Sequence, residues 1–457
     1  MTSALMKRAL LVVLSMTLAA CTAVGPNYQK PVVAVPEQWY GADAATSDKS
    51  IAEVAWFDLF GDPVLRSLIE EALKNSYDAR IAAARVEEAR ARYGIAGAAR
   101  YPDVDYQVRA GFGREGGDTG GAIAANVGAA WELDLWGRIR RLNEAARAQY
   151  LATEEGRHAV QLALVSEVAA AYFDLRELDA ELDITRKTVG AFQNTVDLFN
   201  NRLRGGTASG LETSRAEALL ANAVAQIPLI ERDIIATENQ LNVLMGHMPG
   251  SIARGAALAE QPMPAEVPAG LPAALLLRRP DVRAAEQALI AANANIGVAE
   301  ATFYPTISLT GLLGVQSSDL SELFNEGRVW NIQAGILGPI FNAGRLRNQR
   351  RAAVAQFDAA LAQYEQSVTR AMADASTSIV TLEKLAAAEA ARDRALRANE
   401  EAVRLVNLRY ESGFSAYFEV LDAMQQLFIA QNNLARTRRD RLVALVQLYR
   451  ALGGGWA

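Results

Sequence analysis

Two long stretches of the chain carry apolar residues at alternating spacings of three and four. No proline interrupts either stretch, which run over 138–204 and 344–411. The first stripe contains Leu175, Leu178, Leu182, Val189, Phe192, Val196, Phe199 and Leu203; the second contains Val354, Phe357, Leu361, Tyr364, Val368, Ala371 and Ala375. Small alanines flank both stripes, so helices can pack closely, as in a coiled coil. The pattern predicts two uninterrupted helices, each roughly 100 Å long at 1.5 Å per residue.

Glycines mark the far ends of both predicted helices. Gly205-Gly206 follows the first stripe and Gly413 follows the second, and glycine is the residue type that best adopts a left-handed C-cap. Helical sequence then resumes over 212–245 and 417–451. We therefore expect two antiparallel helical hairpins, at about 138–246 and 344–452.

Before each predicted hairpin lie two stretches in which apolar and polar residues alternate. They span about 103–113, 122–134, 305–315 and 329–338, and each is close to ten residues long, as in a membrane β-strand. A half-buried sheet of a soluble protein alternates in the same way. The coiled-coil helices leave no obvious face to cover such a sheet, which favours the membrane interpretation. Spanning barrels need about eight or more strands, so four strands would require several chains to close one.

The chain repeats itself at a nearly constant offset. A shift of 207 residues aligns Gly137-Arg138-Ile139-Arg140 with Gly344-Arg345-Leu346-Arg347, Gln149-Tyr150 with Gln356-Phe357, Arg202 with Arg409, Gly206 with Gly413, Glu212 with Glu419, Gln240-Leu241 with Gln447-Leu448, and Gly246 with Gly453. Tyr101-Pro102 matches Tyr304-Pro305 at a shift of 203, so we expect one strand hairpin to be four residues longer. The sequence predicts a tandem duplication, with repeats over 62–246 and 272–453, a Pro-rich linker over 247–271 and a short tail over 454–457.

The amino terminus has the pattern of an export signal. Lys7-Arg8 precedes an apolar run that ends at Ala20 and is too short to span a bilayer. Leu18-Ala19-Ala20-Cys21 resembles a bacterial lipobox, which implies that residues 1–20 are removed and that Cys21 carries an S-diacylglycerol and an N-palmitoyl group. The alternative is an incidental cysteine near an ordinary cleavage site, but Cys21 is the one cysteine of the chain. Residues 21–61, punctuated by prolines, are expected to form an extended tether.

Composition excludes several classes of protein. Of 457 residues, 51% are hydrophobic and 21% are charged, so the chain is neither disordered nor fibrous. Its formal net charge is −6, which argues against a strongly basic nucleic-acid binder. One cysteine and two histidines leave little for a metal centre. A mean hydropathy of +0.03 resembles that of a soluble protein.

One glycine-rich motif invites a nucleotide-binding interpretation. Gly111-Phe112-Gly113-Arg114-Glu115-Gly116 matches G-x-G-x-x-G, but another alternating stretch follows it where a nucleotide site needs a helix. We expect an extracellular hairpin loop there. His158 and His247 lie far apart, and no paired carboxylates or nucleophile–base pair stand out. We therefore expect no catalysis and no cofactor.

Together these motifs resemble the TolC-like outer-membrane efflux factors, in particular their OprM-type (or NodT-type) lipoprotein branch. The motifs that carry the resemblance are Cys21, Gly25-Pro26-Asn27-Tyr28, Tyr101-Pro102, Asp134-Leu135-Trp136-Gly137-Arg138, Arg278-Arg279-Pro280-Asp281-Val282-Arg283, Tyr304-Pro305, Gly338-Pro339-Ile340-Phe341, Arg409-Tyr410-Glu411-Ser412-Gly413 and Leu421-Asp422-Ala423. The resemblance implies an α+β membrane protein that forms a homotrimer. Each chain would give four strands to a twelve-stranded outer-membrane β-barrel, continued by a periplasmic α-helical barrel with an equatorial mixed region.

The resemblance also implies partners and a mode of action. The family works with a periplasmic membrane-fusion adaptor and an inner-membrane pump, here expected to be of the resistance-nodulation-division type, and not with nucleic acid. It passively conducts drugs, toxic compounds or metal ions outward. A secreted-polypeptide conduit of type I secretion has the same architecture and stays an alternative, although the lipobox favours small molecules. A periplasmic coiled-coil adaptor is disfavoured by the four alternating stretches.

The same resemblance places a gate at the periplasmic hairpin tips. Phe418 occupies the position of the family's apolar ring, where leucine is commoner, and Asp422 that of its acidic ring one turn further on. Arg409 and Tyr410 occupy positions used for links that hold the tips shut. Each of these residues could instead be a solvated charge or a packing aromatic. The first hairpin offers Glu212 and Glu217 as acceptors, and the pairing stays open.

Overall fold

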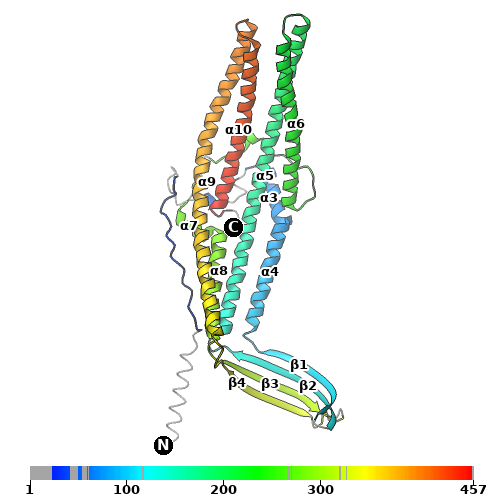
Figure 1. The fold of residues 1–457 in the computed structure, drawn as a ribbon, viewed down its shortest axis with the longest axis vertical. Helices are drawn as coiled ribbons and strands as arrows, with labels where there is room; N and C mark the ends of the chain where they lie inside the picture. The colour runs from blue at the N-terminus through cyan, green and yellow to red at the C-terminus, as the bar shows by residue number, and fades with distance from the viewer. Residues whose placement is uncertain are drawn as a thin grey trace. The chain divides into compact units, whose positions relative to one another are not determined.

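The computed structural model describes residues 23–41, 50–53, 59, 61–115, 118–264, 268, 270–318, 321–325 and 327–454. The predictions on the signal peptide and Cys21 concern residues outside these ranges. In chain order (Figure 1) the elements are η1 (Ile51–Glu53), α3 (Pro63–Asn75), α4 (Tyr77–Ala98), β1 (Asp103–Glu115), β2 (Asp118–Leu133), α5 (Arg138–Arg204), α6 (Gly210–Met245), η2 (Leu258–Glu260), α7 (Pro272–Arg278), α8 (Pro280–Ala301), β3 (Thr306–Ser317), β4 (Arg328–Leu337), α9 (Arg345–Glu411) and α10 (Tyr417–Ala451).

The described residues form two units. Unit 1 contains residues 23–33 and the described residues of Ala84–Glu155 and Arg283–Ser367. Unit 2 contains Ala34–Ala83, Gly156–Val282 and the chain from Val368 onward. The long helices α5 and α9 contribute to both units, and each unit is described below by itself.

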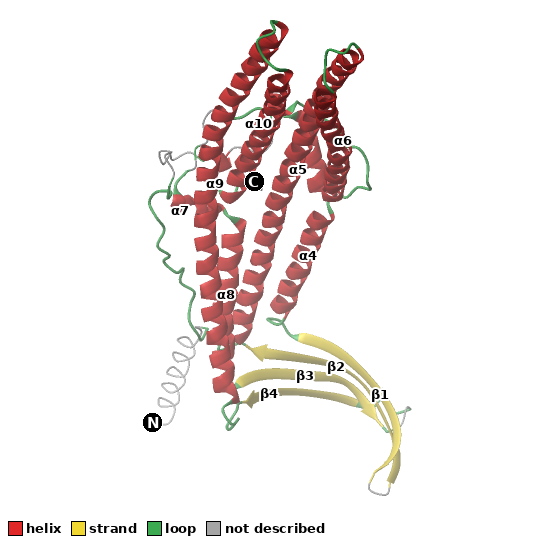
Figure 2. Cartoon of the chain, turned by 45° about the horizontal axis from the view of Figure 1, so that its top comes forward, coloured by secondary structure: helices red, strands yellow, loops and turns green. Residues whose placement is uncertain are grey.

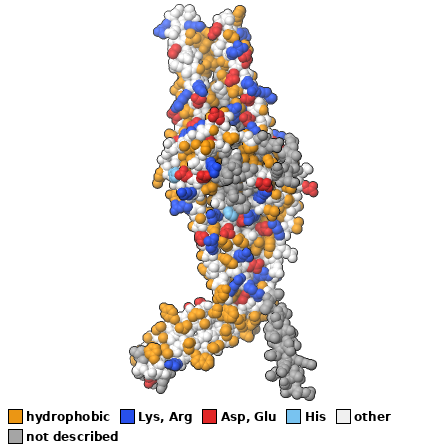
Figure 3. All heavy atoms as spheres, turned by 180° about the vertical axis from the view of Figure 1, so that it is seen from behind, with side chains coloured by type: hydrophobic (Ala, Val, Ile, Leu, Met, Phe, Trp, Pro, Cys, Tyr) orange, Lys and Arg blue, Asp and Glu red, His pale blue; other side chains and the backbone are white. Residues whose placement is uncertain are grey.

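Unit 1 contains one antiparallel sheet in the order β1-β2-β3-β4. The register aligns an apolar row across it: Tyr106, Val127, Leu313 and Trp330. The opposite face carries rows such as Asp103, Ala130, Thr310 and Gln333. The apolar row is nevertheless open to solvent in the chain, with Tyr106 84% and Trp330 75% exposed. Figure 3 shows hydrophobic side chains covering the region of the strands. The sheet therefore has two faces of different polarity and an apolar face that no described helix of the chain covers.

The outer strands of this sheet pair on one side only. β1 pairs with β2, and β4 pairs with β3. Their outward backbone N–H and C=O groups have no sheet partner among the described residues. Exposed strand edges of this length, Asp103–Glu115 and Arg328–Leu337, are surfaces on which another chain can continue the sheet.

The strand boundaries differ in detail from those expected. β2 begins at Asp118 and not near 122, and β1 extends to Glu115. The G-x-G-x-x-G residues up to Glu115 therefore belong to a strand, which corrects the expected loop. The four-residue length difference between the repeats is also located differently. Counted with their turns, the strand hairpins 103–133 and 306–337 differ by only one residue, with 31 and 32 residues. The connection 338–344, in contrast, is three residues longer than 134–137.

Small residues allow close packing of helices in unit 1. Ala145 and Ala148 of α5 lie against Ala291 and Ala294 of α8. Figures 1 and 2 both show α8 running beside the adjoining parts of α5 and α9. Arg350 of α9 donates to the Glu300 carboxylate of α8 at 2.8 Å. Alanine contacts of this kind let helix backbones approach more closely than Leu contacts would.

Unit 2 contains the tips and the greater part of the two helical hairpins, α5 with α6 and α9 with α10. Both α5 and α9 are 67 residues long, as the duplication predicts, and they end before Gly206 and Gly413, whose φ angles are +67° and +78°. Pro228 lies inside α6 on an exposed position, where it removes one helical hydrogen bond. No described helix contains a segment that is both long and apolar enough to cross a membrane. The α+β fold class is confirmed.

Each repeat begins with two consecutive helices, α3 and α4 in the first and α7 and α8 in the second. In the first repeat, α3 ends at Ser76, whose backbone is extended (ψ 138°). In the second, α7 ends at Arg279 (ψ 121°), the residue before Pro280. The ring of a proline disfavours helical conformation in the preceding residue, so the break at Arg279 was visible in the sequence. The short elements η1, α3, η2 and α7 all lie in unit 2.

A buried carboxylate, Asp62, holds the start of α3 against the linker of unit 2. It caps α3 by accepting from the Val64 amide at 2.9 Å. It also accepts from the Tyr172 hydroxyl at 2.7 Å, the Ala256 amide at 3.1 Å and the Gln261 side chain at 2.7 Å. Burial alone would raise its pKa, but the hydrogen bonds from Gln261, Tyr172 and the α3 amides outweigh burial and hold the pKa below its ordinary value.

We predict that Asp62→Ala destabilises the protein by about 1–3 kcal/mol, because several buried donors lose their acceptor. The wild-type contribution is present above the ordinary Asp pKa and is lost as the pH falls through the lowered folded value. Thermal unfolding of the purified protein across a pH series measures both effects. Glu70→Ala, which removes an exposed partner of Arg66 on the same helix, should shift the midpoint little. Equal effects of the two substitutions would contradict the role of Asp62.

Candidate gate at the helical hairpin tips

Both hairpins turn with the same backbone motif at their tips. Gly206 and Gly413 adopt left-handed conformations. The amide after each glycine donates to the carbonyl of Arg202 or Arg409, at 2.8 Å in both hairpins. This is the hydrogen bonding of a Schellman motif, and it fixes the direction in which the chain leaves each long helix.

The first turn is reinforced by a capping box. The Ser209 amide donates to the Glu212 carboxylate at 2.8 Å, and the Glu212 amide donates to Ser209 Oγ at 3.4 Å. Glu212 is therefore engaged within its own turn. In the second hairpin the N-cap of α10 is Ala416, which gives no side-chain cap. Glu217, the other acceptor considered, lies exposed on α6.

An aromatic cluster, here called the tip cluster, joins the two hairpins. Its buried members are Val196, Phe199, Ala216, Tyr417, Val420 and Leu421. The Tyr417 ring lies 4.5 Å from that of Phe199 and 4.7 Å from that of Tyr410, both edge-on. Its hydroxyl is 2.9 Å from Thr195 Oγ1, which itself donates to the Ala191 carbonyl. Helices α5, α6 and α10 thus share one core, against which Tyr410 of α9 packs.

Phe418 and Asp422 lie outside the tip cluster, one turn apart on the exposed face of α10. Phe418 is 58% exposed, and Asp422 is also exposed. The Arg215 guanidinium of α6 lies 5.2 Å from the centre of the Phe418 ring, within the range of a cation–π contact. Phe418 therefore contacts the first hairpin, whereas Asp422 is exposed on the surface of the chain.

Tyr410 and Arg409 differ in what they contact. The Arg202 guanidinium of the first hairpin lies 5.2 Å from the Tyr410 ring. Arg409 instead donates to the Phe414 carbonyl of its own turn at 3.3 Å. Of these two residues, Tyr410 contacts the first hairpin, whereas Arg409 closes the turn of its own hairpin.

Arg215 is a tip residue that the sequence reasoning missed. At the repeat offset of 207 it is the counterpart of Asp422, and Leu211 is the counterpart of Phe418. The alignment that revealed the duplication could have identified Arg215, because it places opposite charges at equivalent positions of the two hairpins. The hairpins are thus equivalent in backbone but complementary in side chains.

A second contact between the hairpins is ionic. Arg436 of α10 donates to Glu181 of α5 at 3.0 Å, and Arg439 lies 3.3 Å from Asp174. Glu177 is buried among them. Burial, helped by Glu181, raises the pKa of Glu177 to about 7 against the influence of the two arginines. Because this pKa lies above the ordinary value of 4.5, the folded state keeps a proton that the unfolded state releases, and stability falls as the pH rises from about 4.5 to about 7.

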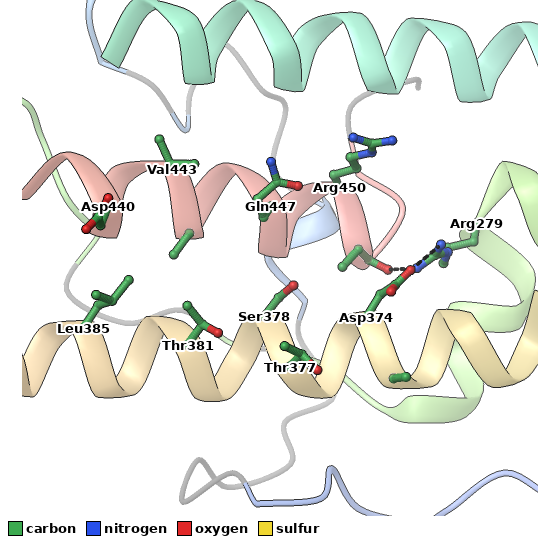
Figure 4. Close-up of a pocket in the computed structure, with 13 residues that line it drawn as sticks. Arg279, Asp374, Thr377, Ser378, Thr381, Leu385, Asp440, Val443, Gln447 and Arg450 are labelled. Carbon is green, nitrogen blue, oxygen red and sulfur yellow. Dashed lines mark hydrogen bonds and ion pairs between the residues drawn. The ribbon is translucent and has the colours of Figure 1, made fainter. Parts of the chain in front are cut away.

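A groove of about 740 Å³ lies between α9 and α10 (Figure 4). Arg279, at one end, donates to the Asp374 carboxylate at 3.2 Å, the Ala451 carbonyl at 3.2 Å and the Asp281 carboxylate at 2.7 Å. These bonds hold the junction of α7 and α8 against α9 and α10. Within the described ranges, no group of three or more His, Cys, Asp or Glu side chains is placed to hold a metal ion.

Comparison with known proteins gives matches over nearly the whole chain. The outer membrane efflux protein family matches residues 68–247 and 271–454. The chain is 37% identical to the toluene efflux pump outer membrane protein TtgI of Pseudomonas putida, over 96% of both chains. It is 34% identical to the cation efflux system protein CusC of Escherichia coli, over 97% of both. The open-state MtrE outer membrane channel of Neisseria gonorrhoeae has a TM-score of 0.88 at 33% identity, covering 95% of this chain and 99% of that one.

We predict an asymmetric cost of breaking the buried bond between Thr195 and Tyr417. Thr195→Val leaves the Tyr417 hydroxyl buried without its acceptor and should cost about 1–3 kcal/mol. Tyr417→Phe leaves Thr195 bonded to the Ala191 carbonyl and should cost less, about 0.5–1.5 kcal/mol. The double variant should be no worse than Thr195→Val alone. Thermal unfolding of the four proteins tests this, and strictly additive losses would show that the two hydroxyls are not coupled.

Proposed function

Because the chain belongs to the outer membrane efflux protein family, we propose that it is the exit duct of a tripartite efflux system in the outer membrane. It acts as a homotrimer and conducts small molecules passively from the periplasm to the exterior. It forms no covalent bond with its cargo, needs no cofactor and is not an enzyme.

The observation that carries this proposal is the two-faced, open-edged sheet of unit 1. A spanning barrel needs an apolar outer face, a polar inner face and no free edges. In this chain the row through Tyr106 supplies the apolar face and the row through Asp103 the polar face. One chain alone, however, leaves the outer edges of β1 and β4 without a partner strand. Three copies, each joined through its β4 to β1 of the next copy, close these edges in a barrel of twelve strands. The polar face then lines a water-filled lumen, and the long hairpins continue the duct into the periplasm.

The periplasmic gate in this proposal is the set of six hairpin tips in the trimer. Phe418 forms the apolar constriction and Asp422 an acidic ring one turn away. The Arg202–Tyr410 and Arg215–Phe418 contacts support it, because both join the second hairpin to the first. Arg409 stabilises the turn that presents these residues. Opening requires the tip of the α9–α10 hairpin to move away from the tip of the first hairpin, so that the ring of tips widens like an iris.

The partners proposed are a periplasmic membrane-fusion adaptor and an inner-membrane pump, most naturally one of the resistance-nodulation-division type. Relatives named for toluene, solvent and cation efflux support a small-molecule or metal-ion cargo. Type I polypeptide secretion, the alternative, is not favoured by these relatives. The lipid anchor proposed is at Cys21, with S-diacylglycerol and N-palmitoyl groups.

The gate is tested by planar-bilayer recordings of the purified trimer. Phe418→Ala combined with Asp422→Ala should raise the single-channel conductance several-fold, because it removes both rings of the constriction. The matched control, Phe414→Ala with Glu411→Ala, also removes one phenylalanine and one carboxylate, but from the neighbouring turn, and should leave the conductance near the wild-type value. Unchanged conductance of the first variant, or an equal rise in the control, would reject the assignment of the two rings.

The anchor is tested by intact-mass spectrometry of protein from membranes. The wild-type chain should start at Cys21 and carry three acyl chains, whereas Cys21→Ser should carry none. Thr22→Ala keeps the cysteine and should remain acylated. An unmodified cysteine in the wild-type protein would exclude the lipoprotein assignment while leaving the duct itself untouched.

A further inference from the structure

Residues 24–28, near the start of the tether, are bound by neighbouring groups of unit 1. The Val24 amide donates to the Trp136 carbonyl at 3.0 Å. Asn293, on α8, donates to the Pro26 carbonyl at 3.0 Å. Residues 24–28, called the leader here, therefore make directional bonds on both sides: to the start of α5 and to α8.

Arg141 of α5 is the centre of this site. Its side chain is 5% exposed. It donates to the Val24 carbonyl at 3.2 Å, the Gly25 carbonyl at 3.1 Å and Asn27 Oδ1 at 2.8 Å. Its ion pair with Glu144, at 2.8 Å, lies on its own helix. A buried guanidinium has five donors to satisfy, and the leader supplies three of the acceptors.

The leader lies in a groove between α5 and α8, and two glycines determine how closely it approaches α8. Gly297 lies inside α8, where glycine is unfavourable relative to alanine. A Cβ at Gly297 would come within 2.8 Å of the Val24 carbonyl oxygen and 2.9 Å of Arg141 Cγ. Gly25, with φ +89°, faces it directly, and a Cβ there would run into the Gly297 backbone. The helix thus has a glycine where the leader backbone must approach it.

The leader's remaining polar groups are also matched. The Tyr28 hydroxyl donates to Glu286 at 3.4 Å, and Lys30 donates to the same carboxylate at 2.7 Å. Each residue from Val24 to Tyr28 therefore contributes a backbone or side-chain group that the groove binds.

We propose that the groove between α5 and α8 is a peptide-binding site specific for the sequence Gly-Pro-Asn-Tyr, whose ligand is the leader of this chain. Because α5 belongs to the first repeat and α8 to the second, the bound leader clamps the two repeats together within unit 1. Gly25 and Gly297 determine whether the peptide enters, and Arg141 with Asn293 reads its backbone and Asn27. This inference does not rest on transport.

The first test is hydrogen–deuterium exchange of the full-length protein, followed by mass spectrometry of peptides covering residues 22–33. Gly297→Ala should raise the exchange rate of the leader amides at least tenfold, towards that of an unprotected peptide. Gly94→Ala is the matched control, because a Cβ at this helical glycine meets no atom within 4 Å. Unchanged leader protection in Gly297→Ala would overturn the proposal.

A substitution in the leader guards against a misfolded Gly297→Ala protein. Asn27→Ala removes the side-chain acceptor of Arg141 without altering either helix, and it should also raise leader exchange. Arg141→Ala should do the same, whereas Arg147→Ala, at an exposed position further along α5, should not. Full leader protection in Asn27→Ala and Arg141→Ala would contradict recognition by these groups.

The second test asks whether the site binds its ligand as a separate molecule. Gly25→Val in the full chain should displace the leader and leave the groove intact. A fluorescent peptide with the sequence of residues 23–30 should then bind this variant saturably, as measured by anisotropy, and the wild-type chain at least tenfold more weakly. The same peptide with alanine for Asn27 should bind at least tenfold more weakly than the unaltered peptide. Absence of saturable binding to Gly25→Val would overturn the proposal.

Discussion

The free backbone edges of β1 and β4 are the constraint on which the rest of the architecture depends. A four-stranded sheet can leave its edges to water, but it cannot leave them to hydrocarbon, where each unpaired group costs several kcal/mol. The apolar row through Tyr106, Val127, Leu313 and Trp330 is too exposed for a sheet that stays in water alone. Closure with further copies resolves both problems at once. In the proposed duct, oligomerisation is therefore a condition for membrane insertion of each chain and not a later step.

The duplication supplies the repeated parts of such a ring, and its divergence supplies the contacts between them. Helices α5 and α9 keep the same length, and both tips keep the same glycine turn. The side chains differ where the hairpins meet, with Arg215 opposite in charge to its counterpart Asp422. Divergence at these positions lets one hairpin hold the aromatic residues of the other, as Arg215 does with Phe418.

The sequence predicts what depends on periodicity and fails where distant polar groups meet. Apolar stripes, alternation and Gly206 or Gly413 were enough to predict the long helices, the strands and the turns. Asp62 reads as an ordinary N-cap, yet it accepts from Tyr172 and Gln261, which lie far along the chain. No local pattern encodes such a convergence. The gate positions Phe418 and Asp422 were predicted from the resemblance to a family. The Arg202–Tyr410 contact became visible only in the structure, because neither spacing nor composition specifies which charged side chain at the tips contacts which ring.

The distribution of apolar residues explains why these buried polar groups matter. A mean hydropathy near zero suggested a soluble protein, but many apolar residues lie along helical stripes and on one face of a sheet. Among the described residues, the tip cluster and the alanine contact between α5 and α8 are two separate places where they gather. Narrow alanine-rich contacts are non-directional and permit sliding between helices. The hydrogen bonds of Asp62 and Arg141 are directional, because each requires particular donors or acceptors at fixed positions. Orientation between elements is therefore set by these polar groups, and helix movement at the tips requires breaking few of them.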